Sequence, residues 1–286
     1  MKLVGLMPVR NEAWVLGLSA RVALQWCDEL MIGLHECSDA SAAIVGDIYR
    51  EFPGRITIAT REAGAWEEMR HRQSLLQMAR EHCWQATHIA LIDADEILTA
   101  NLVPTIRQSI ERLSESIMML PLYNLRGSMD RYHANGTWGR RIVSVAFKDS
   151  PELEWRGDRF HHREPMGRVW RPFQPYGQAD GGVLHLWGAN ERRLAAKHRL
   201  YKITERLRWP DKDVREIEQM YSMYDKGALG DDPRRWTFNS VPESWIEPYR
   251  ELMEKHLHLD AVPWQEAECE RLIAEHGRER FAGLSV

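Results

Sequence analysis

The sequence predicts an α/β protein with a doubly wound, mostly parallel sheet and a helical C-terminal extension. Three observations predict this fold class. Short apolar runs of strand length alternate with helical patterns of about ten residues or more through the first 125 residues. A polar turn follows most of the apolar runs, and beyond about residue 210 the chain shows only helical patterns. Ligands of such sheets bind at the carboxyl ends of the strands.

The first part of the chain supplies most strands of the predicted sheet. Its strand candidates are 3–7, 30–34, 56–58, 88–92 and 117–122. Helical spacing marks the intervening segments 13–25, 41–49, 66–82 and 102–113. Because a helix separates successive strands, we expect parallel pairing between them.

The segment 123–182 has no helical periodicity. It contains one strand candidate, at 142–147. Long irregular segments of compact domains are usually functional or disordered. The aromatic content here predicts order, and four tryptophans are candidates to line a groove, namely Trp138, Trp155, Trp170 and Trp187. A strand candidate at 183–187 follows. Helical patterns then cover 190–208, where Asn190 is a candidate cap, and 214–224, 244–256 and 264–276.

Composition narrows the possible classes of protein. The 38 Lys and Arg against 42 Asp and Glu argue against a surface that binds nucleic acid throughout. Four cysteines without a CxxC pair indicate reduced thiols. No apolar run reaches the roughly 20 residues of a membrane span, and the N-terminus is too short for a signal sequence. We therefore expect a cytoplasmic protein.

The acidic run Asp93, Asp95 and Glu96 directly follows the apolar run 88–92. On an extended backbone Asp93 and Asp95 point to one side and Ala94 to the other. Two converging carboxylates repel each other, and burial adds to that cost. A divalent cation offsets the repulsion, and oxygen ligands suit Mg²⁺ or Mn²⁺. The alternative is that these acids cap the next helix and face water.

Three motifs occur in a recognisable order, and they are Pro8-Val9-Arg10-Asn11-Glu12, Ser38-Asp39-Ala40-Ser41 and Asp93-Ala94-Asp95. With them, the first 125 residues resemble the nucleotide-sugar-binding half of family 2 glycosyltransferases with the GT-A fold. The resemblance implies that the first motif lies along the nucleoside, with Pro8, Arg10 and Glu12 as candidate contacts. It implies that Asp39 touches the base or ribose, and that the DxD motif holds the metal and the diphosphate. Leu34 and His35 stand where the family often has two acids.

A second, looser likeness concerns Gly182-Val183-Leu184-His185 and Lys197-His198-Arg199-Leu200-Tyr201, which are similar to the end of the catalytic domain in some of these enzymes. It implies that His185 joins Asp95 and Asp93 at the metal and that Lys197 faces the phosphates. The implied domains are a GT-A catalytic domain, 1–209, with halves 1–125 and 126–209, and the helical extension 210–286.

The implied activity is transfer of a sugar from a nucleotide-diphosphate donor, most often a UDP-sugar, to an unknown acceptor hydroxyl, with Mn²⁺ or Mg²⁺ as cofactor and with inversion. An inverting enzyme also needs a carboxylate base for the acceptor. The candidates are Asp158, Glu164 and Asp180, with a slight preference for Asp158 because it lies in the irregular aromatic stretch.

Other interpretations remain open for these residues. The alternative role of Asp39 is an Asx turn that stabilises its loop, that of Glu12 is a helix cap, and that of His185 is a core position. His161 and His162 lack further zinc ligands at a recognisable spacing.

Other functions remain open as well. A nucleic-acid-binding protein or nucleic-acid-modifying transferase would use the Trp- and Arg-rich stretch 131–187. A non-catalytic GT-A scaffold would bind nucleotide without turnover. A nucleotidyltransferase would need a glycine-rich basic loop after the first strand, and a nicotinamide dehydrogenase would need GxGxxG there; the sequence has neither.

Overall fold

A computed structural model describes residues 1–286 except 62–66, 84, 140, 158–162 and 223–231. The chain forms two compact units. Unit 1 comprises 1–122, 141–185 and 242–258, and unit 2 comprises 123–140, 186–241 and 259–286. Each unit is described by itself below.

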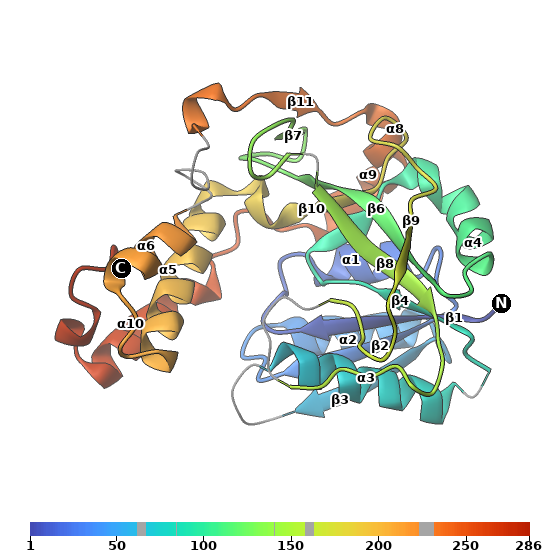
Figure 1. Ribbon diagram of the computed structural model, residues 1–286, viewed down its shortest axis with the longest axis horizontal. Coiled ribbons are helices and arrows are strands. Elements are labelled where there is room, and N and C mark those ends of the chain that lie inside the picture. Colours follow the sequence, from blue (N-terminus) through green and yellow to red (C-terminus); the bar gives the residue numbers. More distant parts are fainter. Residues whose placement is uncertain (62–66, 84, 140, 158–162, 223–231) are drawn as a thin grey trace. The chain divides into compact units, whose positions relative to one another are not determined.

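Unit 1 holds the large sheet and its covering helices (Figure 1). Its strands are β1 Leu3–Val9, β2 Glu29–His35, β3 Ile56–Arg61, β4 His88–Leu91, β5 Glu96–Leu98, β6 Ser116–Asn124 (whose last two residues belong to unit 2), β8 Arg141–Lys148, β9 Arg171–Phe173 and β10 Val183–His185. Its helices are α1 Leu16–Ala23, α2 Ser41–Glu51, α3 Glu68–His82, α4 Val103–Glu111, α8 Glu243–Ile246 and α9 Arg250–His256.

The sheet confirms the predicted fold class. Its strand order is β3-β2-β1-β4-β8-β6-β10-β5, with β9 beside β6. Strands β3, β2, β1 and β4 are parallel, as expected for strands joined through helices. The later strands differ from that expectation, because β8 is antiparallel to both β4 and β6, and β10 is antiparallel to β5.

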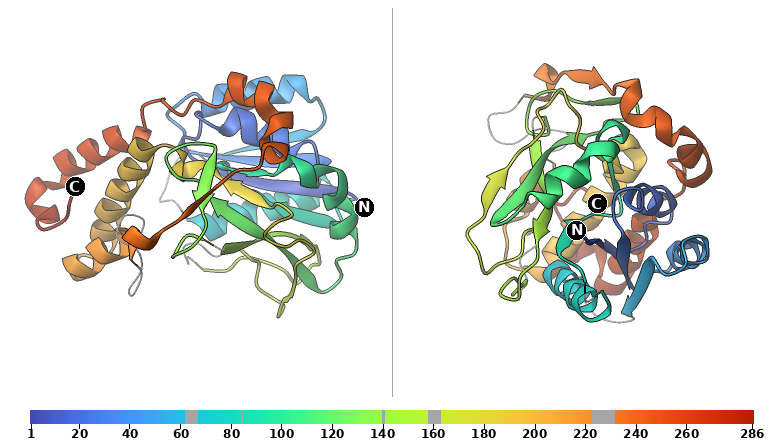
Figure 2. Two further views of the ribbon diagram at one scale, coloured as in Figure 1. Left: turned by 90° about the horizontal axis from the view of Figure 1, so that it is seen from above. Right: turned by 90° about the vertical axis from the view of Figure 1, so that its right-hand side faces the viewer.

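Helices cover both faces of the parallel strands (Figure 2), and an apolar layer lies between helices and sheet on each face. Because successive side chains of a strand alternate, Leu3 and Met7 pack in one layer while Val4 and Leu6 pack in the other. Residues of α1, α2 and α4 complete the first layer, and residues of α3 complete the second. This arrangement is the doubly wound sheet that the sequence predicts.

Strand β1 lies at the point where the strand order reverses. The chain runs from β1 to β2 and β3 on one side and then returns to β4 on the other. In open α/β sheets the crevice outside the carboxyl ends at such a reversal is the usual ligand site. The loop after β1 and the acidic run after β4 therefore share the favoured position.

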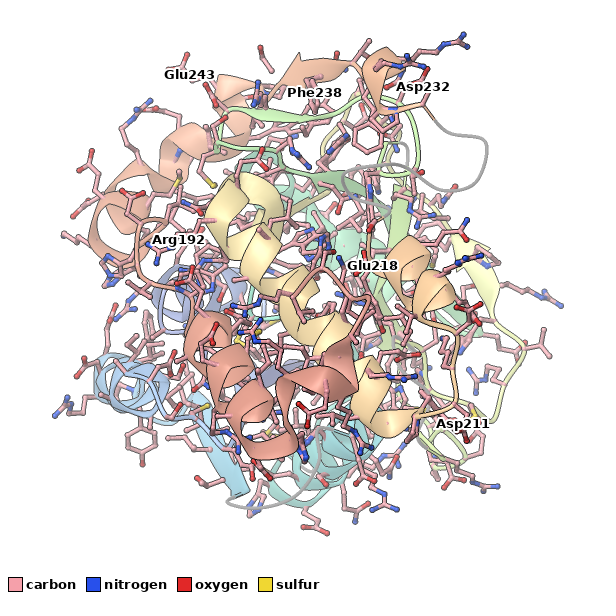
Figure 3. All side chains as sticks on the ribbon, turned by 90° about the vertical axis from the view of Figure 1, so that its left-hand side faces the viewer. Arg192, Asp211, Glu218, Asp232, Phe238 and Glu243 are labelled. Atoms are coloured by element: carbon pink, nitrogen blue, oxygen red, sulfur yellow. The ribbon has the colours of Figure 1, made fainter. Side chains whose placement is uncertain are left out.

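Unit 2 contains helices α5 Glu191–Arg208, α6 Val214–Tyr221 and α10 Trp264–His276, and a two-stranded ribbon of β7 Arg131–His133 and β11 Phe238–Ser240. Asn190 caps α5 as expected, because its side chain accepts from the N–H of Arg193 at 3.0 Å. Helix α5 packs against α10 and α6, and Figure 3 shows Arg192 on α5 and Glu218 on α6. The domain boundary expected after residue 209 stays a prediction.

Candidate active site

Asp93, the first acid after β4, is bound by two arginines. Nη2 of Arg72, on α3, donates to Oδ1 of Asp93 at 2.8 Å. Nη1 of Arg163 donates to Oδ2 of the same carboxylate at 3.0 Å. Burial alone would raise the pKa of Asp93, but the two guanidinium groups outweigh it and lower this pKa to about 2. Asp93 is therefore ionised at neutral pH, and both of its oxygens already accept hydrogen bonds.

Arg72 is itself buried, with 2% of its side chain exposed. Its Nε and Nη2 donate to Oε1 of Glu68 at 3.1 and 2.9 Å. Its Nη1 is buried and has no hydrogen-bond partner among the described residues. A buried guanidinium N–H without an acceptor is costly. The guanidinium that holds Asp93 thus has one nitrogen whose N–H groups have no acceptor among the described residues.

Asp95, the second acid, faces His185 from the neighbouring strand. Antiparallel pairing of β5 and β10 sets His185 opposite Glu96. This register brings Nε2 of His185 to 3.6 Å from Oδ2 of Asp95. The Asp95 side chain is 10% exposed and that of His185 is 20% exposed. Two candidate metal ligands named from the sequence are thus side by side.

A divalent cation fits this pair as a partial site. In the described part of the chain, no three His, Cys, Asp or Glu side chains gather as a complete metal site. Mg²⁺ is usually held by one or two carboxylates together with substrate phosphates rather than by an all-protein cage. Asp95 with His185 matches such a site, in which a diphosphate supplies the remaining oxygens. Asp93 fits less well as a direct ligand because Arg72 and Arg163 occupy its oxygens.

Asn11 joins the loops that follow β1 and β2. Its side-chain oxygen accepts from the backbone N–H groups of Ser38 and Asp39 at 2.7 and 3.2 Å. Its backbone has φ 55°, a left-handed conformation that Asn tolerates better than most residues. Oδ1 and Oδ2 of Asp39 accept from the N–H groups of Ser41 and Ala13, each at 2.9 Å. The structure thus gives Asp39 a loop-closing role, and its contact with the nucleoside stays a prediction.

The other candidate contacts of the first motif lie in β1 or directly after it. Pro8 lies within β1 opposite Gly33. Arg10 lies beside Glu36, with Nη2 and Oε2 separated by 3.5 Å. Glu12 accepts from the indole N–H of Trp14 at 2.6 Å, while its backbone carbonyl accepts from the N–H of Leu16. The expected contacts of Pro8, Arg10 and Glu12 with a nucleotide stay predictions.

The three candidate bases have different surroundings. Asp158 lies outside the described residues, as do His161 and His162. Glu164 directly follows Arg163 in unit 1 and accepts a hydrogen bond from the hydroxyl of Ser144 on β8. Asp180 is exposed and closes a tight turn by accepting from the N–H of Gly177 at 2.8 Å. Among the described candidates, only Glu164 adjoins the arginine that binds the acids.

Lys197 belongs to unit 2, where its ammonium group lies over the Trp187 ring at 5.0 Å and near the Tyr201 ring at 6.0 Å. These are cation–π distances. Its expected contact with phosphate stays a prediction.

The tryptophans do not form the open groove that we expected. Trp155 packs in the core of unit 1 with Phe147, and Trp187 packs with Trp138 in unit 2. Trp155 and Trp187 are buried, and Trp138 and Trp170 are partly buried. Base stacking needs open ring faces, so these rings give little support to a nucleic-acid interface over 131–187. The physical reason for the difference is that apolar ring area contributes to each core.

Arg72, Arg163 and Asn11 are site residues whose contacts sequence reasoning did not predict. The contacts of Arg72 and Arg163 with Asp93 span 21 and 70 residues. Of the three, only Asn11 had a sequence signal, because Asn tolerates a left-handed backbone conformation better than most residues.

Comparisons with known proteins reveal distant structural likenesses. No protein-family model matches the chain, and no curated protein sequence does so. The structure of S. aureus TarS is 11% identical with a TM-score of 0.43, and the match covers 98% of this chain and 54% of that one. The chain thus spans about half the length of TarS. The mannosyltransferase PcManGT from Pyrobaculum calidifontis, in complex with GDP-Man and Mn²⁺, is 10% identical with a TM-score of 0.42 over 97% of this chain and 75% of that one.

A third match is glucosyl-3-phosphoglycerate synthase from Mycobacterium tuberculosis, in complex with Mg²⁺ and UDP. It is 14% identical with a TM-score of 0.30 and covers 43% of each chain. TM-scores and identities this low carry no argument about function. Among the described residues, no helix combines the length and apolar character that crossing a membrane requires.

Proposed function

We propose that this chain is a glycosyltransferase that takes a sugar from a nucleotide-diphosphate donor with the help of Mn²⁺ or Mg²⁺. The observation that carries the proposal is the pairing of Asp95 with His185 at 3.6 Å. Asp95 follows β4, one of the two strands beside β1, where the strand order reverses and open α/β sheets bind ligands. The motifs after β1, β2 and β4 resemble those of family 2 glycosyltransferases, and this supports a nucleoside diphosphate as the ligand.

Each residue has a stated role in this proposal. Asp95 and His185 would hold the cation, which when bound stabilises the negative charge that develops on the departing diphosphate. Arg72 would donate through its buried Nη1 to the nucleotide. Asp93, held by Arg72 and Arg163, would orient the ribose or a cation-bound water rather than ligate the cation directly. We propose a UDP-sugar as the donor, and the acceptor is open.

We propose Glu164 as the base of an inverting reaction. An acceptor hydroxyl gives its proton to a carboxylate while its oxygen attacks the sugar carbon and the bond to the diphosphate breaks. Glu164 is the described candidate that follows Arg163 directly, whereas Asp180 is committed to a surface turn. The hydrogen bond from Ser144 orients the Glu164 carboxylate.

The test is thermal stabilisation by UDP, GDP and their glucose and mannose conjugates, each with and without Mn²⁺. A ligand that binds only the folded protein raises its Tm. We expect a Mn²⁺-dependent rise for one nucleoside class in the wild type and in Asp180→Asn, a control at an exposed turn. We expect the rise to disappear in Asp95→Asn. Absence of a rise with every nucleotide in the wild type would refute the proposal.

A further inference from the structure

We infer that Arg163 is a positioning residue that fixes the base Glu164 relative to the acids Asp93 and Glu96. The inference rests on the proposed function and adds to it a residue that couples the donor side of the site to the acceptor side. Arg163 is buried, with 11% of its side chain exposed. It comes directly before Glu164 in the chain, so its position limits where the Glu164 carboxylate lies.

The hydrogen bonds of Arg163 use every N–H donor that a guanidinium has. Its Nε donates to the carbonyl of Ser144 at 2.7 Å. Its Nη1 donates to Asp93 and Glu96, each at 3.0 Å. Its Nη2 donates to the carbonyl of Leu91 at 2.6 Å and to the second oxygen of Glu96 at 2.8 Å. A guanidinium has five N–H donors in a rigid plane, so Arg163 is fully satisfied and held in one orientation.

Ser144 connects this arginine to the proposed base. Its backbone carbonyl accepts from Arg163, and its hydroxyl donates to Glu164. Ser144 is 1% exposed on β8, and its backbone is fixed in the sheet by pairing with Met119. Two consecutive residues, 163 and 164, are thus both hydrogen-bonded to Ser144, which the sheet holds in place. One of them faces the acids after β4, and the other carries the carboxylate that would receive the acceptor proton.

Lysine at position 163 would keep the charge but lose the geometry. An ammonium group has three donors on a single atom and cannot span Asp93, both oxygens of Glu96 and two carbonyls. The segment would then shift, and a displacement of about 1 Å at a reacting group costs about 100-fold in rate. Arg72 still holds Asp93 in such a variant, so donor binding should change less than turnover does.

Arg80 offers a matched control in the same unit. Its Nε and Nη2 donate to the two oxygens of Asp149 at 2.9 and 2.7 Å. Its Nη2 also donates to the carbonyls of Ser150 and Leu153 at 2.7 and 3.0 Å. Arg80→Lys therefore breaks a similar forked contact with a carboxylate and two carbonyls, but none of these partners is an acid of the proposed site.

The experiment compares wild type, Arg163→Lys and Arg80→Lys. The Kd of UDP with Mn²⁺ is measured by calorimetry. The kcat is measured for hydrolysis of the donor, in which water accepts the sugar and the nucleoside diphosphate is released. The donor is whichever of UDP-glucose or GDP-mannose stabilises the wild type more. We expect Arg163→Lys to lower kcat by about 100-fold with less than about a tenfold change in Kd, and Arg80→Lys to leave both within about threefold.

Two outcomes would overturn the inference. One is a kcat in Arg163→Lys that equals that of Arg80→Lys, and the other is a loss confined to Kd. Failure of the proposed function is distinguishable, because it appears in the wild type as an absence of nucleotide binding and of turnover. If Arg163→Lys does not fold, Glu96→Gln is tested in its place. It replaces one of the two Glu96 oxygens that accept from Arg163 with an amide NH2 group, which cannot accept. It should lower kcat in the same way, and an unchanged kcat there would also overturn the inference.

Discussion

Arg163 and Asp93 are joined by a hydrogen bond of 3.0 Å between Nη1 and Oδ2, so the first acid after β4 is paired with an arginine. The second acid, Asp95, faces His185 instead. The Asp93 carboxylate thus accepts from an arginine, and the Asp95 carboxylate lies beside a histidine. We propose that the two acids have different roles. Asp95 binds the cation, and Asp93 is held in place by the arginines beside it.

Replacing Asn11 should loosen the two loops that it joins. Asn11→Ala removes the acceptor of two backbone N–H groups and places a less tolerant residue at φ 55°. Each such hydrogen bond contributes about 0.5–1.5 kcal/mol, so we expect the loss of both to lower the free energy of unfolding by about 1–3 kcal/mol in urea titrations. Asn11→Asp keeps an acceptor oxygen and should lose less than half as much. Equal losses in the two variants would contradict this role.

Replacing Glu164 should affect turnover and spare donor binding. Glu164→Gln keeps the shape of the side chain but cannot accept the acceptor's proton, and loss of a general base costs about 100- to 10,000-fold in kcat. The rate is measured as release of the nucleoside diphosphate at saturating donor, with water as the acceptor whose proton the base takes. Asp180→Asn is the matched control and should retain the wild-type rate. A Glu164→Gln enzyme with wild-type kcat would assign the base to another residue.

The stability of unit 1 should depend on pH through His88, which begins β4 and is 5% exposed. Burial, assisted by Lys148, lowers the pKa of His88 below its usual value of about 6.5. The unfolded chain therefore binds more protons than the folded one as pH falls through this value. The stability that neutral His88 contributes is therefore present at higher pH and is lost as the pH falls below about 6.5. The loss is about 1.4 kcal/mol for each unit by which the pKa of His88 differs between the folded and unfolded chains.

The check is urea unfolding at about pH 7.5 and about pH 5, where the wild type should lose stability. His88→Asn does not titrate and can replace the contact of Nδ1 with the Thr87 hydroxyl, which measures 2.9 Å. The variant should lose less stability than the wild type over the same interval. The pKa of His256 is also lowered, chiefly by burial, so only the difference between the two proteins reports on His88. Identical pH dependence in both would contradict the prediction.

The parallel half of the sheet could be predicted because its signals are local. Apolar runs alternate with helical spacing there, and the strands near residues 3, 30, 56 and 88 all form. The short strands β5 and β9 were not predicted, because three residues show no periodicity and depend on pairing with β10 and β6. The single helix expected at 244–256 is interrupted at 247–249, where Pro248 cannot continue a helix interior.

The candidate site was predictable where the residues follow a strand and unpredictable where they come from distant segments. Asp93 and Asp95 were named because an apolar run precedes them, and His185 was named because the segment around it resembles the end of the catalytic domain in some family 2 glycosyltransferases. Arg72 and Arg163 lie in polar segments where arginine is ordinarily solvated, and burial beside Asp93 appears only in the folded chain.

The central claim is that Asp95, rather than Asp93, carries the divalent cation. The most direct measurement is Mn²⁺ binding in the presence of UDP, followed by the loss of the free Mn²⁺ electron paramagnetic resonance signal. Wild type should bind Mn²⁺, Asp95→Asn should lose about 100-fold or more in affinity, and Asp93→Asn should lose less because Asp95 and His185 remain. Wild-type affinity in Asp95→Asn, or a larger loss in Asp93→Asn, would contradict the claim.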